Sequence, residues 1–219
     1  MNKLLILFLS GILTGATLAG AFCYLLLKPP SAGAQDSGTA VIDRLIAEWM
    51  EEGRHGMVLR SGIPYRAELL DAKPGFFPET VQSLACSVET HYRVPKGVVL
   101  AQWALESRWG MSALGVSNYF GHTFAAVKQF MKEPRFILVR ERVMRMGHMV
   151  LGDTVRFARY RNITECFNVH GQYVSRSALY TSAFKTKSPE DFARELAKRY
   201  ATDPAYALKL IVIMRRYGL

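Results

Sequence analysis

The sequence predicts a mostly helical α+β domain that carries one small β-hairpin and follows an N-terminal transmembrane helix. One observation is an uncharged apolar stretch over residues 4–27. Another is a series of segments with apolar residues at helical spacing, most of them between residues 78 and 219. A third is an alternating apolar and charged run over residues 136–160, which is typical of strands. The chain has 219 residues, so about one ordinary domain remains after the membrane segment.

Residues 1–28 are expected to form a signal anchor. Lys3 precedes the apolar stretch and Lys28 ends it. As a helix, residues 4–27 would span roughly 36 Å, which is enough to cross a hydrocarbon core of about 30 Å. This length disfavours a buried helix of a soluble domain. The small residues 32–34 (AGA) leave a second interpretation open, a signal peptide cleaved near Ala34. In both cases the rest of the chain is exported.

The next segments lead up to the main domain. Residues 29–40 are rich in Pro, Gly, Ser and Ala and are expected to be a linker. Residues 41–77 form an N-terminal extension, predicted to be helical at first and then broken by glycines and prolines. Helices are predicted from Pro78 to about Tyr92 and from Pro95 to about Leu105, because proline favours a first helical turn and apolar residues follow at helical spacing.

The second half of the domain begins with the predicted hairpin. Its first strand places Ile137, Val139, Glu141 and Val143 on one face. Helices are predicted after the hairpin over residues 163–173, from a Ser-Pro start at 188–189, and from an Asp-Pro start at 203–204 to Gly218. A serine before the first turn is a favoured N-cap, and a glycine after the last turn is a favoured stop.

The charge of the chain indicates which kinds of molecule it can bind, and its cysteine content bears on metal sites and disulfides. Lys and Arg number 28 and Asp and Glu 18, which gives a net charge of +10. This suits nucleic acid, anionic lipid or acidic cell-wall peptides, and export argues against nucleic acid. The sequence has no Cys-x-x-Cys pair and no ligand spacing among its histidines, so we expect no metal site and no cofactor. Cys86 and Cys166 are open to two interpretations, a disulfide or two free thiols.

Glu106 is the candidate for acid chemistry. It ends the predicted apolar helix and is followed by residues 107–110 (SRWG). A carboxyl at the end of a buried helix, beside an indole, is expected to have a raised pKa. Such a group can protonate a leaving oxygen. On spacing alone, an ordinary glutamate paired with Arg108 is the commoner arrangement.

The chain resembles the peptidoglycan N-acetylglucosaminidases of glycoside hydrolase family 73. The resemblance rests on residues 104–114 (ALESRWGMSAL) with 117–121 (SNYFG), on residues 200–210 (YATDPAYALKL), and more weakly on residues 157–160 (FARY) followed by Glu165. It covers about residues 78–219. The family usually has Gly, Leu and Ile where this chain has Arg108, Tyr119 and His122. The resemblance implies a lysozyme-like, two-lobed fold, with a glycan groove between a helical lobe and a small β lobe.

The resemblance also implies roles for single residues. Glu106 matches the general acid. The family's second carboxylate usually lies in the β lobe, which makes Glu141 the candidate for the base or for the group that stabilises positive charge on the sugar. Asp153 and Glu165 are the alternatives. Glu141 could instead have no catalytic role and be a strand carboxylate neutralised by Arg140 or Arg142. Tyr200 matches a tyrosine near the acid. The expected substrate-binding residues are Trp109, Asn118, Tyr119, Phe120 and Tyr206, the last also an alternate for Tyr200.

The implied function is cleavage of the β-1,4 bond after N-acetylglucosamine in peptidoglycan glycan strands. The domain would lie in the periplasm, attached to the bacterial inner membrane by residues 4–27. A lytic transglycosylase on the same fold is one alternative, although a Gly-Leu-Met-Gln stretch after the glutamate is absent. A catalytically inactive peptidoglycan-binding or assembly module is the other. The sequence identifies neither a protein assembly partner nor an oligomeric state, and it does not distinguish retaining from inverting chemistry.

Overall fold

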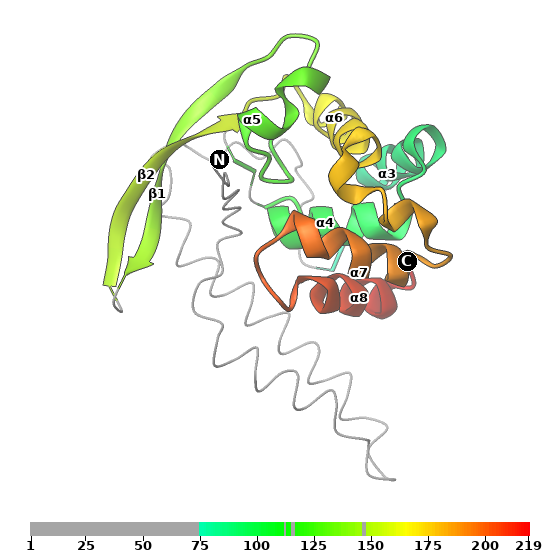
Figure 1. Ribbon diagram of the computed structural model, residues 1–219. Helices are drawn as coiled ribbons and strands as arrows, with labels where there is room; N and C mark the ends of the chain where they lie inside the picture. The colour runs from blue at the N-terminus through cyan, green and yellow to red at the C-terminus, as the bar shows by residue number, and fades with distance from the viewer. Residues whose placement is uncertain (1–74, 112, 115–116, 146–147) are drawn as a thin grey trace, which may run out of the picture. The chain divides into compact units, whose positions relative to one another are not determined.

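The structure is a computed structural model that describes residues 75–219 except residues 112, 115–116 and 146–147 (Figure 1). The predicted anchor, linker and helix over residues 41–52 lie outside the described residues. Among the described residues, no helix has the length and apolarity needed to cross a membrane. The described chain forms two units. Residues 140–153 belong to one, and residues 75–139 and 154–219 form the other, which we call the helical body.

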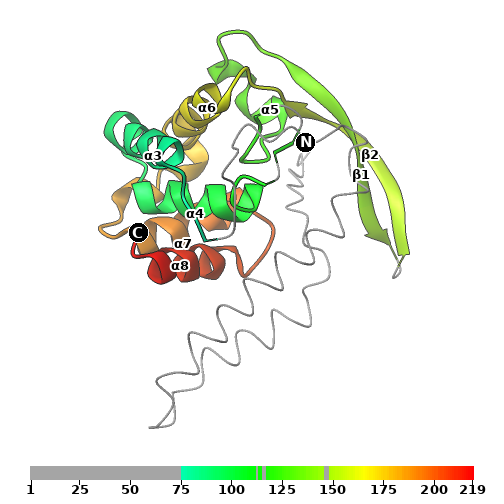
Figure 2. The same ribbon diagram turned by 180° about the vertical axis from the view of Figure 1, so that it is seen from behind.

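The helical body is arranged around a buried helix, α4. Residues 97–104 of this helix are all buried, and apart from Gln102 they are apolar or small, as expected for a helix enclosed by others. It contacts α3, α7 and α8, and α3 in turn contacts α6 (Figures 1 and 2). The bounds of the longer helices are α3 (Glu79–Tyr92), α4 (Lys96–Ser107), α6 (Ile163–Arg176), α7 (Pro189–Tyr200) and α8 (Tyr206–Tyr217).

The predicted helix ends agree with the observed ones to within a few residues. Ser188 caps α7 by accepting a hydrogen bond of 3.1 Å from the backbone N–H of Asp191, and Pro189 is the first helical residue. Gly218 ends α8 in the left-handed conformation, with φ of 62°. Helix α8 begins later than predicted, because the Asp203 side chain accepts a 2.8 Å bond from the N–H of Ala205 and forms a turn before the helix.

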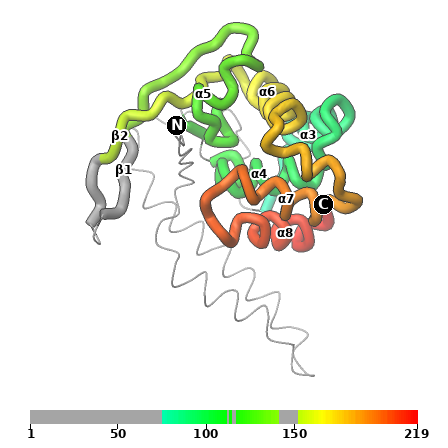
Figure 3. Tube along the Cα trace, in the orientation of Figure 1, coloured from blue at the N-terminus to red at the C-terminus, as the bar shows by residue number. Residues whose placement is uncertain are grey.

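The predicted hairpin is confirmed. Strands β1 (Phe136–Arg145) and β2 (His148–Ala158) pair as a two-stranded sheet. The alternation also holds where β1 leaves the helical body, since Val139 is buried and Leu138 is exposed. Figure 3 shows the chain passing from α4 through short helices into the hairpin and back to α6. Sequence periodicity missed these and other single-turn elements, namely α5 (Phe124–Val127), η1 (Lys128–Phe130), η2 (Ala178–Tyr180) and η3 (Ala183–Lys185).

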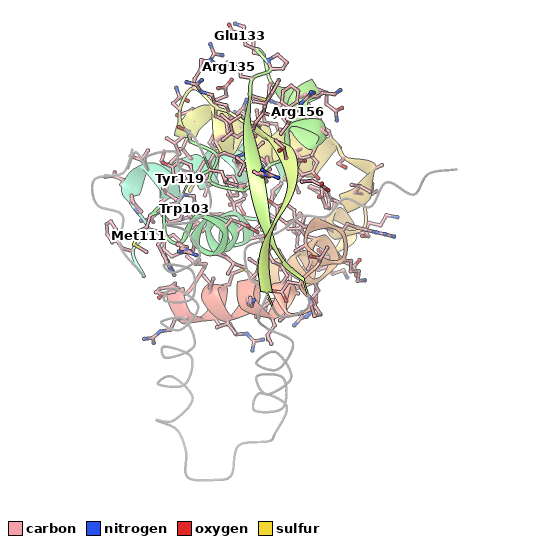
Figure 4. All side chains as sticks on the ribbon, turned by 90° about the vertical axis from the view of Figure 1, so that its left-hand side faces the viewer. Trp103, Met111, Tyr119, Glu133, Arg135 and Arg156 are labelled. Atoms are coloured by element: carbon pink, nitrogen blue, oxygen red, sulfur yellow. The ribbon has the colours of Figure 1, made fainter. Side chains whose placement is uncertain are left out.

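Aromatic side chains fill the helical body, and an ion-pair cluster lies at one end. Trp103 and Tyr119 are among the largest fully buried side chains (Figure 4). Glu133 and Arg135 lie at the end of the body opposite to α8 (Figure 4), where Arg135 forms a 3.2 Å ion pair with Glu165. Both cysteines of the described chain are free thiols; Cys86 is exposed and Cys166 is buried.

Candidate active site

A sharp turn ends α4 directly after Glu106 and Ser107. Arg108, Trp109 and Gly110 follow with φ of 52°, 59° and 80°, all in the left-handed region. The hydroxyl of Ser107 donates to the carbonyl of Trp103 over 2.6 Å and accepts from the N–H of Gly110 over 2.8 Å. The turn therefore keeps Glu106 in the last helical turn. A left-handed residue after a helix is most easily glycine, and this chain has Arg108 at that position.

Glu106 is a partly buried carboxyl with an unusual pKa. Its Oε1 atom accepts a 2.7 Å hydrogen bond from the hydroxyl of Tyr206. Loss of hydration raises the pKa of Glu106 from its ordinary 4.5 to about 7; the Tyr206 bond and the Lys209 ammonium lower it, and the Asp203 carboxylate raises it. Close to half of the Glu106 side chains are therefore protonated at neutral pH. This is the protonation balance that a general acid needs.

Two tyrosines surround the acid, and they contact it differently. Tyr206 donates directly to Glu106, whereas the Tyr200 hydroxyl donates to the carbonyl of Phe120 over 3.4 Å. The two rings are stacked with centroids 5.6 Å apart. Burial and the nearby Glu106 charge raise the pKa of both tyrosines well above the ordinary value, so both stay protonated donors. Of the two tyrosines in the motif at residues 200–210, Tyr206 therefore forms the hydrogen bond with Glu106, and Tyr200 stacks on the ring of Tyr206.

A buried ion pair also contributes to the setting of the acid. The ammonium of Lys209 lies 2.6 Å from a carboxylate oxygen of Asp203, and their side chains are only 8% and 15% exposed. Both residues lie in the sequence motif at residues 200–210, but the sequence did not predict their contact. Asp203 precedes α8 and Lys209 lies within it, so helical spacing gave no signal for the pair.

All five predicted substrate-binding residues, Tyr206 among them, are buried in the helical body. Trp109 is 2% exposed and packs against Phe77 and Tyr217, with ring centroids 4.8 Å away in each case. Tyr119 and Phe120 are each 1% exposed. The contacts that the structure shows for these side chains are with the protein, and contact with a sugar stays a prediction.

Asn118, another of these five residues, organises the loop after Glu106. Its Oδ1 atom accepts a 3.0 Å bond from the N–H of His122, and its Nδ2 atom donates to the carbonyls of His122 and Ala158, also over 3.0 Å. A Cβ atom added to Gly121 of the same loop would lie 3.9 Å from Oε2 of Glu106. The loop thus passes close to the acid.

Buried histidines behind the acid were not predicted as site residues. His122 and His170 are both fully buried. Burial lowers the pKa of His122 to about 3 and that of His170 well below its ordinary value, so both rings are neutral. They are connected to Glu106 through Gln102 and Tyr206, and a single sequence gives no signal for such a connection.

Three residues are candidates for the second carboxylate: Glu141, Glu165 and Asp153. Glu141 lies in β1, and its side chain is outside the described part of the structure. Glu165 is committed to the start of α6, because its Oε2 accepts from the N–H of Arg161 over 2.6 Å and its own N–H donates to Asn162 over 2.9 Å. Asp153 lies in β2. Within the described residues, no group of three His, Cys, Asp or Glu side chains could hold a metal ion.

Comparison with known proteins gives a family and a fold. A family profile described as "Glucosaminidase: Mannosyl-glycoprotein endo-beta-N-acetylglucosaminidase" matches residues 82–219. The catalytic domain of the autolysin Auto from Listeria monocytogenes has a TM-score of 0.53 at 23% identity, covering 77% of this chain and 94% of that one. This likeness supports the expected α+β fold with its hairpin.

Further solved structures are similar at lower TM-scores. A peptidoglycan hydrolase mutant from Sphingomonas sp. A1 has a TM-score of 0.49 at 25% identity, covering 63% of this chain and 94% of that one. A C-terminally truncated glycoside hydrolase domain of FlgJ from Salmonella typhimurium has 0.49 at 24% identity, covering 64% and 94%. A comparison with curated proteins found no significant match.

Proposed function

Because the chain belongs to the glucosaminidase family of glycoside hydrolases, we propose that it cleaves the β-1,4 bond after N-acetylglucosamine in peptidoglycan glycan strands. The observation that carries the proposal is the state of Glu106. Its pKa of about 7 keeps a large fraction of it protonated at neutral pH, and Tyr206 is bonded to it over 2.7 Å. The peptidoglycan substrate is supported by the sequence words around this residue and by the Sphingomonas hydrolase that the chain resembles.

In the proposed reaction, protonated Glu106 donates its proton to the glycosidic oxygen. The bond between that oxygen and the anomeric carbon then breaks, and the sugar left behind becomes oxocarbenium-like. The carboxylate that forms on Glu106 keeps the hydrogen bond from Tyr206 and lies near the ammonium of Lys209. Both interactions favour the charged form, so they stabilise the product of proton transfer.

We assign the second carboxylate to Glu141. In a strand, residues two apart share a face, and the sequence alternation therefore assigns Glu141 to the same face as Ile137 and Val139. A charged residue on a face that is apolar at its start needs a reason to be there. Glu141 would either act as a base or nucleophile, or orient the 2-acetamido group of the sugar, whose carbonyl can attack the anomeric carbon. The commitment of Glu165 to the start of α6 leaves Asp153 as the alternative.

The proposal extends to where the enzyme acts. Residues 4–27 would anchor it in the bacterial inner membrane, and the domain would lie in the periplasm. The net charge of +10 would hold the protein near the anionic wall polymer. An anchor and a short linker would confine cleavage to the wall close to the membrane.

The test is digestion of purified sacculi by the full chain in detergent, with the new glycan ends identified by mass spectrometry. We expect reducing N-acetylglucosamine ends from the wild type and a loss of about 10²–10⁴-fold in rate for Glu106→Gln. Glu141→Gln should also lose activity, whereas Glu133→Gln, whose side chain is 60% exposed, should not. Anhydro-muramyl ends would assign the protein to the lytic transglycosylases. Sacculus binding without any cleavage would assign it to the inactive wall-binding modules.

A further inference from the structure

A continuous row of hydrogen-bonded side chains runs from the acid through the helical body. We call it the buried relay, and its members in order are Glu106, Tyr206, Gln102, His170, His122 and Tyr160. The successive distances between donor and acceptor atoms are 2.7, 3.2, 3.2, 3.1 and 2.7 Å. Its members come from α8, α4, α6, the loop before α5 and the segment after β2 (Figure 1). The relay therefore connects Glu106 with side chains from separate segments of the helical body.

The hydrogen bonds of the relay all have the same direction. The oxygen of Gln102 can only accept, so Nε2 of His170 must donate to it. The ring of His170 is neutral, which makes its Nδ1 atom an acceptor for Nε2–H of His122. The Nδ1 atom of His122 then accepts from the hydroxyl of Tyr160. Every donor in the relay thus points toward Glu106.

Packing keeps the two histidine rings in place. Phe120 lies flat on His170, with ring centroids 3.8 Å apart and planes within 8°. Tyr173 meets His122 edge to face at 5.8 Å, and Tyr200 meets His170 in the same way at 6.1 Å. These aromatic neighbours bring no full charge to the histidines. The apolar surroundings favour neutral rings, and a neutral ring has one donor and one acceptor nitrogen.

We propose that the His122–His170 pair is a positioning device that keeps the Tyr206 hydroxyl donating to Glu106. The donor nitrogen of His170 occupies the oxygen of Gln102, and this orients the amide of Gln102 with its NH₂ group toward Tyr206. Tyr206 receives a hydrogen bond from that NH₂ group, so its own proton is directed to the carboxyl. Without the histidines, the amide of Gln102 is free to turn and present its oxygen to Tyr206. The Tyr206 proton would then be drawn away from Glu106.

The inference rests on the proposed role of Glu106 as the acid, and it makes a separate claim about the pKa of that residue. Among the described residues, the charged and titratable groups that interact with Glu106 are Tyr206 and Lys209 on α8, Asp203 before α8, and Tyr200 on α7. Loss of the Tyr206 bond removes one of the two interactions that favour the carboxylate. The pKa of Glu106 should therefore rise when the relay is broken.

The experiment measures the pKa of Glu106 by NMR titration of the full chain, labelled with ¹³C-glutamate, in detergent. The Glu106 signal is identified by its absence in Glu106→Gln. In His170→Phe, which keeps an aromatic ring against Phe120, we expect the pKa of Glu106 to rise by about one pH unit. Tyr206→Phe should raise it by at least as much. The double variant should match Tyr206→Phe alone, since the histidine acts only through that hydroxyl.

Several outcomes would overturn the inference. One is an unchanged Glu106 titration in a folded His170→Phe protein. Another is a double variant in which the two shifts add. Where His170→Phe does not fold, Tyr160→Phe decides instead, because it removes a single hydroxyl at the far end of the relay. A smaller rise supports the inference, and no rise overturns it. The titration needs no turnover, so failure of the glucosaminidase proposal, seen as cleavage retained by Glu106→Gln, is distinguishable from failure of this one.

Discussion

Replacing Glu106 by glutamine should change how the stability of the domain depends on pH. The pKa of Glu106 is raised from an ordinary 4.5 to about 7 in the folded protein. The folded state therefore binds this proton more tightly than the unfolded chain does. Its contribution to stability is fully present below pH 4.5 and is lost as the pH rises through 7. Since one pKa unit corresponds to about 1.4 kcal/mol, the loss amounts to roughly 3 kcal/mol.

Glutamine resembles the protonated carboxyl and does not titrate. Its oxygen can still accept from Tyr206, so we expect wild type and Glu106→Gln to be about equally stable near pH 4.5. At pH 8 the variant should be more stable by roughly 2–3 kcal/mol. Urea unfolding followed by tryptophan fluorescence, at half-unit pH steps, measures the difference. Titration of His122 and His170 affects both proteins and cancels in that difference.

The control and the refuting result follow from exposure. Glu133 has a side chain 60% exposed and a 3.8 Å contact with Arg161, so Glu133→Gln should differ from wild type by less than about 0.5 kcal/mol at every pH. A difference between wild type and Glu106→Gln that stays constant from pH 4.5 to 8 would show that Glu106 titrates normally. The argument for it as a neutral-pH acid would then fail.

Three further predictions use the same protein. The rate of sacculus digestion should fall on the alkaline side with a midpoint near pH 7, following the deprotonation of Glu106, and a flat rate up to pH 9 would contradict its role as the acid. Arg108→Gly should stabilise the domain by about 1 kcal/mol in urea unfolding, because Arg108 has φ of 52°; Arg93→Gly, with φ of 59° at the end of α3, is the matched variant away from the acid. Lys209→Met should cost about 3 kcal/mol by leaving Asp203 buried without its cation, and Lys209→Met with Asp203→Asn should recover much of that loss.

Much of the fold was predictable because its signals are local. Proline, serine and glycine mark the helix ends at 78, 95, 188 and 218, and each acts through the backbone of its own turn. Alternation over a few residues likewise identified both strands. The single-turn helices between α4 and β1 were missed because one turn is too short to show a period. The late start of α8 depends on the side chain of Asp203, which competes with the helix for a backbone N–H.

Site residues could be proposed from the sequence only where they lie within a local motif. Glu106 could be proposed as the acid from its place at the end of an apolar helix and from the motif around it. The choice between Tyr200 and Tyr206 as its direct partner could not be made, because it depends on how α8 packs against α4. The contacts of Gln102 with His170 and of His170 with His122 join residues 68 and 48 positions apart. Contacts between residues so far apart in the sequence produce no periodic pattern that a single sequence could reveal.

The buried relay and the turn after Glu106 have a consequence for the newly made chain. The acid is surrounded by segments that are far apart in the sequence, so its environment exists only once α4, α6 and α8 have packed together. In an unfolded chain Glu106 would return to its ordinary pKa of 4.5, and at pH 7 only roughly one molecule in 300 would carry the proton. In the folded protein close to half of them do. Completion of the fold is therefore also the event that would make Glu106 competent as the proposed acid, because an unfolded chain carries almost none of the protonated form.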